Sequence, residues 1–167
     1  MSKLVLFVNS DSYYVSGGRL AFYYLAEAYY RVYKNALLIT HNGEALRLIR
    51  NKLTIPIQII DTKMRKMTLR QFEYIYRLLR LEIQKPLIVI SNQRVIAGFF
   101  YSKKYNLKHL YVMHGVFKVK SGKQIVDRLF RMVFHYTLKR TNFVSVSSSF
   151  WKDYPNHIGT IYNGAEF

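Results

Sequence analysis

The chain has 167 residues, the length of one domain with a substantial core, and half of them are hydrophobic, which excludes a disordered protein. It contains no cysteine, so disulfide frameworks and thiolate metal sites are excluded as well. The 26 Lys and Arg residues outnumber 9 Asp and Glu residues, and the formal net charge of +17 indicates an anionic partner: nucleic acid, a membrane surface or a phosphate-bearing substrate.

Short apolar runs alternate with helical patterns along the chain. The runs predict strands at residues 3–8, 35–40, 56–61, 86–91, 109–113 and 143–147, with a further strand at 160–162. Apolar residues at helical spacing predict helices at 17–33, 44–53, 68–84, 94–105 and 124–140. Because alternating strands and helices form right-handed βαβ units, we expect one α/β domain: a Rossmann-like open parallel sheet of six to seven strands with helices on both faces.

We expect no targeting or membrane-spanning segment. The apolar stretches are all shorter than the roughly 20 residues that a helix needs to cross a bilayer. The run at 1–8 has the pattern of a strand rather than of a signal peptide, which needs a longer apolar core and a cleavage site. The expected location is therefore cytoplasmic.

In a parallel sheet, ligands bind at the carboxyl ends of the strands, so the loops there are the places to look for a site. The loop after the first strand lacks the G-x-G-x-x-G and P-loop patterns, which argues against NAD, FAD and ATP sites of those types. It ends in Gly17 and Gly18 at the start of a helix, where exposed backbone N–H groups favour phosphate. Taken alone, the pair fits a tight strand-to-helix turn better.

His114 and Gly115 follow the apolar strand at 109–113. A single histidine is more often structural than catalytic, but a position at the ligand-binding edge favours a functional role. No Asp, Cys or second His stands at metal-ligand spacing, so we expect no metal site, and the sequence has no G-x-S-x-G nucleophile elbow.

The predicted helix at 124–140 has a narrow polar stripe within a wide apolar arc. We expect a well-buried helix with one solvated strip; the alternative is a helix that also contacts a membrane or a second domain. The polar stripe consists of Gln124, Arg128, Arg131, His135 and Lys139.

Taken in order, these loops resemble the N-terminal domain of retaining glycosyltransferases with the GT-B fold, specifically the large glycosyltransferase family 4. The family's pattern begins with a Gly-Gly turn into a helix, here at Gly17, and continues with a strand ending in His-Gly, here at His114. A strand closing in a serine pair follows, here 147–148, and then a hinge of the type Ile-x-Asn-Gly-x-Asp, here 161–166. The chain departs from this pattern at Glu166, where Asp is usual, which is a conservative change.

The resemblance implies one half of a two-domain enzyme. Residues 1–162 correspond to the N-terminal, acceptor-side domain, and 163–167 to the start of the interdomain hinge, with Asn163, Gly164 and Glu166. The family's C-terminal domain binds the nucleotide-sugar and carries paired glutamates. It is absent from this sequence, so we expect it in the same protein or in a second chain.

The resemblance also implies an activity: transfer of a sugar from a nucleotide-sugar donor to a glycan or lipid-linked acceptor, with retention and without a metal or cofactor. Gly17 and Gly18 would face the donor diphosphate. His114, as the catalytic residue, would lie near the anomeric carbon and the acceptor hydroxyl. Further substrate contacts would come from Asn92, Gln93, Gly115 and Ser147.

Positive charge is concentrated in one part of the sequence, since residues 94–140 hold eleven Lys and Arg residues and one acid, Asp127. Polybasic surfaces gain about 1 kcal/mol per Lys or Arg held near an anionic leaflet. We therefore expect peripheral attachment at the inner face of a bacterial cell membrane; the alternative is that the charges are solvated. The clusters expected to contact the membrane are Lys63, Arg65 and Lys66, and Lys118, Lys120 and Lys123.

Two other functions compete with sugar transfer. A basic nucleic-acid-binding domain would explain the charge and the 15 Tyr and 11 Phe residues. It leaves the Gly-Gly and His-Gly loops unexplained, and the aromatic residues cluster in apolar helical stretches such as 22–24, so we do not expect a nucleic-acid partner. The third candidate is a non-catalytic scaffold domain, which would bind neither a sugar nucleotide nor a polyanion.

Overall fold

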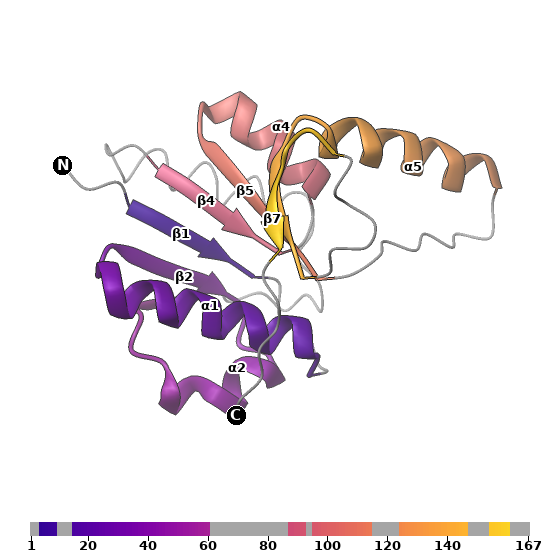
Figure 1. Ribbon diagram of the computed structural model, residues 1–167. Coiled ribbons are helices and arrows are strands. Elements are labelled where there is room, and N and C mark those ends of the chain that lie inside the picture. The colour runs from indigo at the N-terminus through magenta and orange to yellow at the C-terminus, as the bar shows by residue number, and fades with distance from the viewer. Residues whose placement is uncertain are drawn as a thin grey trace.

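The structure is a computed structural model that describes residues 4–9, 15–60, 87–92, 95–114, 124–146 and 154–160. These residues form a seven-stranded parallel sheet with helices on both faces (Figure 1), which confirms the predicted fold class. The strands are β1 (Leu4–Val8), β2 (Ala36–Thr40), β3 (Ile57–Ile59), β4 (Leu87–Ser91), β5 (Lys108–Met113), β6 (Asn142–Ser145) and β7 (His157–Thr160). The helices are α1 (Gly17–Tyr33), α2 (Glu44–Ile49), α4 (Val95–Tyr105) and α5 (Gln124–Leu138), with a 3-10 turn, η1 (Arg50–Lys52).

The strand order is β3-β2-β1-β4-β5-β6-β7. The chain therefore runs outward from β1 to β3, returns to the other side of β1 at β4, and continues outward to β7. The switch point of the sheet lies between β1 and β4, which pair in parallel. In open parallel sheets, the crevice that takes a ligand forms at this point, beyond the carboxyl ends of the strands.

Alternate strand residues point to opposite faces of the sheet, and each face is covered by its own apolar cluster. On one face, Phe7 of β1 and Leu38 of β2 pack with Phe22 of α1. On the other face, Leu6 of β1 packs with Ala97 of α4. A third cluster joins β5 and β6 to the C-terminal half of α5 and contains Tyr111, Met113, Phe134, Leu138 and Phe143.

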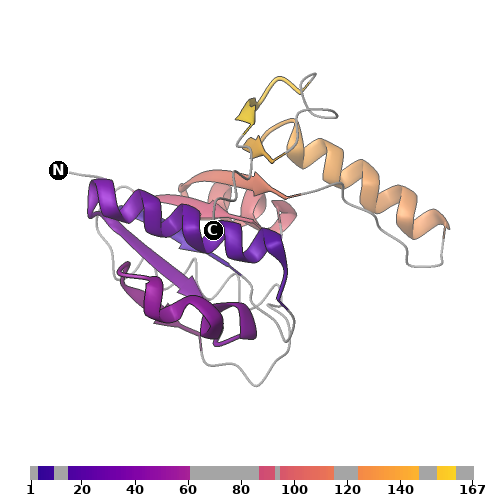
Figure 2. The ribbon, with the colours of Figure 1, turned by 60° about the horizontal axis from the view of Figure 1, so that its bottom comes forward.

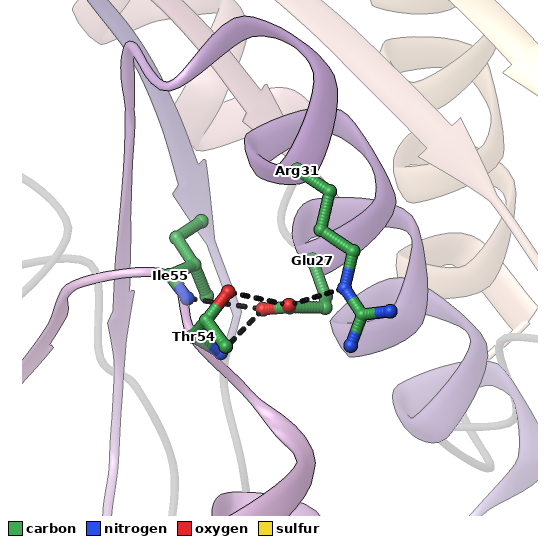
Figure 3. Close-up of polar contacts among 4 residues, drawn as sticks. All are labelled: Glu27, Arg31, Thr54 and Ile55. Atoms are coloured by element: carbon green, nitrogen blue, oxygen red, sulfur yellow. Dashed lines mark hydrogen bonds and ion pairs between the residues drawn. The ribbon is translucent and has the colours of Figure 1, made fainter.

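One buried carboxylate ties α1 to the segment that precedes β3 (Figure 3). Glu27 accepts hydrogen bonds from the backbone N–H groups of Thr54 and Ile55 at 2.7 and 3.0 Å, and from the Thr54 hydroxyl at 2.7 Å. Arg31, one turn further along α1, donates a fourth at 2.8 Å. Burial by itself raises the pKa of Glu27, but these hydrogen bonds outweigh it and lower the pKa to about 2. Glu27 is thus ionised at neutral pH.

Two predicted boundaries are corrected by the structure. The strand predicted to begin at 160 begins earlier, because β7 runs from His157 to Thr160, and 161 and 162 lie outside the described residues. The sequence of this edge strand contains no apolar run that would predict it, and its Ile158 is 63% exposed. The strand is defined by its backbone pairing with β6. The helix predicted at 44–53 ends at Ile49 and continues as η1. The helix predicted at 68–84 lies outside the described residues.

The expectation that the last helix is well buried is wrong. The buried residues of α5 are Phe134, Thr137 and Leu138, all in its C-terminal half, whereas Ile125 near its start is 77% exposed. The reason is visible in Figures 1 and 2, where α5 projects beyond the sheet and only its C-terminal end lies close to the other elements. Across the described ranges, no helix combines the length and the hydropathy needed to span a membrane.

Candidate functional site

Polar side chains gather where the central strands end. Asn9 follows β1 and Asn92 follows β4. The register pairs the residues before them, Val8 and Ser91, so the two asparagines leave the sheet side by side at the switch point. His114 follows β5, the strand on the other side of β4. The three side chains thus belong to neighbouring strand ends at the edge where a ligand is expected.

The pleat of the strands directs these side chains to the face covered by α1. Phe7, Ile90 and Val112 each precede one of the three by two positions, and all belong to the core cluster beneath α1. Because residues two apart share a face, the polar side chains continue the same face beyond the core.

Polar atoms of the same side chains are buried and have no hydrogen-bond partner in the described part of the chain. Asn9 is fully buried, and neither atom of its amide has a partner. Oδ1 of Asn92 and both ring nitrogens of His114 are also unpaired there. An unpaired buried polar group costs about 1–3 kcal/mol, so nearly all such groups in native proteins are hydrogen-bonded. This cluster is therefore suited to the polar groups of a ligand.

The first turn of α1 packs directly on His114. A Cβ atom at Gly18 would lie 3.0 Å from the His114 Cβ and 3.1 Å from its Cγ, so glycine permits this close approach. A Cβ atom at Gly17 would meet nothing within 4 Å, so this position faces open space. Neither glycine has a left-handed backbone. The backbone angles therefore do not require glycine at either position.

The start of α1 is electropositive. The backbone N–H groups of Arg19 and Leu20 bond to the Ser16 carbonyl, and the Ser16 side chain makes no capping hydrogen bond. The N–H groups of Gly17 and Gly18 have no acceptor within the helix. Arg19 adds a buried guanidinium to this turn. Such a helix start suits an anionic group such as a diphosphate.

His114 is held in its neutral form. Burial lowers the pKa of its imidazole below 6.5. Its ring meets that of Phe22 edge-on, with centroids 6.5 Å apart, which restrains its orientation. In a neutral imidazole, one ring nitrogen donates and the other accepts a hydrogen bond. His114 can therefore orient a hydroxyl group or exchange a proton with it.

Other polar residues near this edge already have partners. The Ser91 hydroxyl bonds to Nε2 of His109 at 2.8 Å, and burial lowers the pKa of His109 to about 4. The Ser145 hydroxyl bonds to Nε2 of His157 at 3.0 Å. These contacts link neighbouring strands, so we interpret both pairs as structural.

Four predicted site residues, Gly17, Gly18, Asn92 and His114, come from α1, β4 and β5 and lie at this edge of the sheet. Sequence reasoning missed Asn9, although a polar residue that ends a buried strand is a usable signal. The other predicted residues lie outside the described ranges: Gln93, Gly115, Ser147, Asn163, Gly164, Glu166, Lys63, Arg65, Lys66, Lys118, Lys120 and Lys123. Among the described residues, no three His, Asp or Glu side chains gather where they could hold a metal ion.

Solved glycosyltransferase structures share this fold. A glycosyltransferase from Rickettsia africae ESF-5 superposes with a TM-score of 0.58 over 88% of this chain, at 18% sequence identity. HepE from Anabaena, in complex with UDP and glucose, has a TM-score of 0.59 over 86% of the chain, at 11% identity. MurG from Acinetobacter baumannii has a TM-score of 0.50 over 87%, at 13% identity. The chain spans 38% of the length of the first two proteins and 42% of the third.

No protein-family model and no curated protein matches the sequence. At such low identities, the structural likeness concerns the fold. The chain has the Rossmann-like fold of one domain of GT-B glycosyltransferases, as its sequence motifs predict.

Proposed function

We propose that the chain is the acceptor-side half of a glycosyltransferase, which moves a sugar from a nucleotide-sugar donor to a glycan or lipid-linked acceptor. The observation that carries this proposal is a set of buried polar atoms with no hydrogen-bond partner among the described residues, beside the electropositive start of α1. These atoms are the amide of Asn9, Oδ1 of Asn92 and the ring nitrogens of His114. The polar side chains offer hydrogen bonds to sugar hydroxyls. The start of α1 offers a site for a diphosphate.

The N–H groups of Gly17 and Gly18, with Arg19, bind the donor diphosphate in this scheme. As the sugar leaves, negative charge grows on the departing phosphate. Preorganised N–H groups and a cation stabilise that charge without a metal ion or a cofactor. HepE, which has been crystallised with UDP and glucose, shares the fold, and this supports a nucleotide-sugar as the donor.

His114 acts at the reacting centre. Its neutral imidazole accepts a hydrogen bond from the acceptor hydroxyl and orients it toward the anomeric carbon, while the departing phosphate takes the proton. Attack then comes from the side on which the phosphate leaves, so the configuration is retained. The ordered Gly-Gly and His-Gly motifs, which resemble those of glycosyltransferase family 4, support this assignment.

A second Rossmann-like half completes the cleft, in the same protein or in a second chain. This chain covers only 38% to 42% of the length of the similar structures, which supports a second half. Asn163, Gly164 and Glu166 form the start of the hinge. The further sugar contacts come from Gln93, Gly115 and Ser147.

The enzyme attaches peripherally to the inner face of a bacterial cell membrane, where a lipid-linked acceptor would be found. The net charge of +17 supports this location. The contacts assigned to the membrane are Lys63, Arg65 and Lys66, and Lys118, Lys120 and Lys123.

The test is a sugar-transfer assay with the chain alone and with its donor-binding half. We expect no measurable transfer from the 167-residue chain and recovery when the second half is supplied. In the complete enzyme, His114→Ala lowers kcat about 100-fold or more. His135→Ala, which removes an exposed histidine on α5, is the control and leaves kcat unchanged.

Three results would contradict the proposal. Turnover by the chain alone would show that the donor half is not needed. Wild-type kinetics in a folded His114→Ala variant would make this histidine structural. Salt-sensitive binding of generic RNA, with no binding of sugar nucleotides, would favour the nucleic-acid alternative.

A further inference from the structure

α5 has a second apolar side, which is exposed to solvent. Ile125, Leu129, Met132 and Tyr136 follow one another at intervals of four, three and four residues, so they lie on one side of the helix. Their exposed fractions are 77, 53, 62 and 49%. In the described part of the chain, these are four of the eleven large hydrophobic residues with exposed side chains, and they form one stripe.

The stripe lies opposite the packed side of the helix. Phe134, Thr137 and Leu138 are buried, and this side packs on β5, β6 and α4. Phe134 precedes Tyr136 by two positions, which is about half a helical turn. A helix that only covers a sheet needs one apolar side. The second apolar side of α5 therefore calls for a separate explanation.

Positive side chains border the stripe. Arg128 and Arg131 are exposed on α5, and Lys139 is exposed directly after its last residue. The Arg140 guanidinium lies 3.9 Å over the centre of the Tyr136 ring. The single acidic residue between 94 and 140 is Asp127, which is half-buried. The apolar stripe is thus edged by cations with almost no opposing acid.

α4 extends this surface. The rings of Phe99 in α4 and Tyr136 in α5 are 6.4 Å apart. The ring of Phe100, 5.3 Å from Phe99, is 51% exposed. Lys103 and Lys104 on the same helix are also exposed. Apolar and basic groups therefore continue from α5 onto its neighbour.

We propose that this exposed face of α5 binds the surface of an anionic lipid bilayer. Helices with an apolar side bordered by Lys and Arg lie in the plane of the membrane interface. Ile125, Leu129 and Met132 insert below the headgroups. The long side chains of Arg128 and Arg131 reach lipid phosphates while their stems cover apolar surface.

Charge favours lipid over a second copy of the chain as the occupant. A symmetric contact would bring the cations around the stripe against the same cations of the other copy, and like charges that face each other oppose association. An anionic leaflet neutralises them instead. The arrangement of the elements agrees with this choice, because α5 projects beyond the sheet and only its C-terminal end lies close to the other elements (Figures 1 and 2).

The inference deepens the membrane attachment in the proposed function by assigning a contact to α5, and it does not depend on sugar transfer. α5 begins on the side of the sheet to which the strands point, the side that also holds the candidate site (Figure 1). Docking through the projecting end would therefore bring that edge of the sheet toward the lipid surface. Vesicle binding can nevertheless be measured without any sugar substrate, so its failure is distinguishable from a failure of sugar transfer.

The test is co-sedimentation of the 167-residue chain with vesicles of phosphatidylcholine, alone or mixed with phosphatidylglycerol. Leu129→Gln with Met132→Gln removes two apolar side chains and keeps helix-forming residues. We expect the partition coefficient onto mixed vesicles to fall about tenfold or more. The matched control is Val32→Gln with Leu48→Gln, at positions on α1 and α2 that are 71 and 62% exposed, and it leaves binding unchanged.

A second pair of variants tests the charges. The triple change Arg128→Gln, Arg131→Gln and Lys139→Gln lowers binding to mixed vesicles about 100-fold at low salt, because each cation contributes about fivefold. The control triple removes the same charge from exposed residues of α2 and η1 and lowers binding about fivefold or less. It consists of Arg47→Gln, Arg50→Gln and Lys52→Gln.

Circular dichroism verifies that each variant is folded. Loss of binding confined to the α5 variants and to mixed vesicles supports the proposal. Equal loss in the controls, or equal binding of the wild-type chain to neutral vesicles, would overturn it. So would a dimer in sedimentation velocity that the α5 variants dissociate while vesicle binding stays unchanged, since a second copy would then cover the stripe.

Discussion

The middle and the start of α1 differ in how their buried polar groups are hydrogen-bonded. In the middle, the Glu27 carboxylate accepts four hydrogen bonds and anchors the segment before β3 (Figure 3). At the start, the helix faces Asn9, Asn92 and His114, and the described residues offer no partner to the amide of Asn9 or the ring of His114. Paired groups hold elements of a fold together, whereas unpaired ones are available to a ligand.

This difference matters energetically, because leaving a buried donor or acceptor without a hydrogen bond costs about 1–3 kcal/mol for each group. An apolar side chain of similar size avoids this cost, so a chain selected for stability alone would not keep polar groups at the switch point. Their presence at the ligand edge is what the proposed function explains. The contrast with Glu27 leads to four predictions.

The largest effect is expected at the paired carboxylate. Glu27→Gln places an NH₂ donor against the donors of Thr54 and Ile55, and lowers the free energy of unfolding by about 3 kcal/mol. Arg31→Gln is the matched control: its side chain is 64% exposed, so the change costs about 0–1 kcal/mol. Urea unfolding followed by circular dichroism measures both. Equal effects would mean that α1 and the segment before β3 are stabilised by the ion pair with Arg31 and not by the hydrogen bonds from Thr54 and Ile55.

Acid should unfold the protein in two ranges of pH. His109 has a pKa lowered from 6.5 to about 4. Its contribution to the free energy of unfolding is therefore complete above pH 6.5 and is lost as the pH falls to 4. Glu27 has a pKa lowered from 4.5 to about 2, so its contribution is complete above 4.5 and is lost as the pH falls to 2. Each loss amounts to about 3 kcal/mol.

The measurement is the free energy of unfolding over a series of pH values. The Glu27→Gln variant should keep the upper range and lose the lower one. A variant with the same slope as the wild type in both ranges would show that Glu27 is not the group titrating at low pH.

Gly18 and Gly17 form a matched pair at the start of α1. Gly18→Ala must displace His114, whose Cβ lies 3.0 Å from the new atom, and costs about 1–2 kcal/mol. Gly17→Ala meets nothing within 4 Å and leaves stability unchanged or slightly raised. Thermal unfolding compares the two. If Gly17→Ala were the more destabilising change, the packing of α1 on His114 would need revision.

The smallest effect on stability is expected at Asn9. Asn9→Leu removes two buried polar atoms that have no hydrogen-bond partner among the described residues. At similar volume, it changes the free energy of unfolding by about 1 kcal/mol or less in either direction. The same variant should bind a sugar nucleotide or acceptor more weakly in the complete enzyme. A loss of stability as large as that of Glu27→Gln would show that Asn9 is structural and that the comparison between the two regions fails.

By itself, the amino-acid sequence determined the α/β class and the parallel sheet, and it placed four candidate site residues at one edge of that sheet. The apolar runs 3–8 and 86–91 could only be strands covered on both faces, and alternation with helices implies that they are parallel. Gly17, Gly18, Asn92 and His114 follow from this topology, because every parallel strand ends at the same edge.

Tertiary structure alone decided what covers each surface. β7 carries no apolar run, so pairing with β6 and not its own residues sets its limits. The apolar arc of α5 predicted burial, yet Ile125 is exposed, since periodicity records which side of a helix is apolar and not whether a neighbour packs on it. In the sequence, Asn9 could not be distinguished from an ordinary loop residue, because only the fold shows that its side chain is buried and that no described residue pairs with its amide.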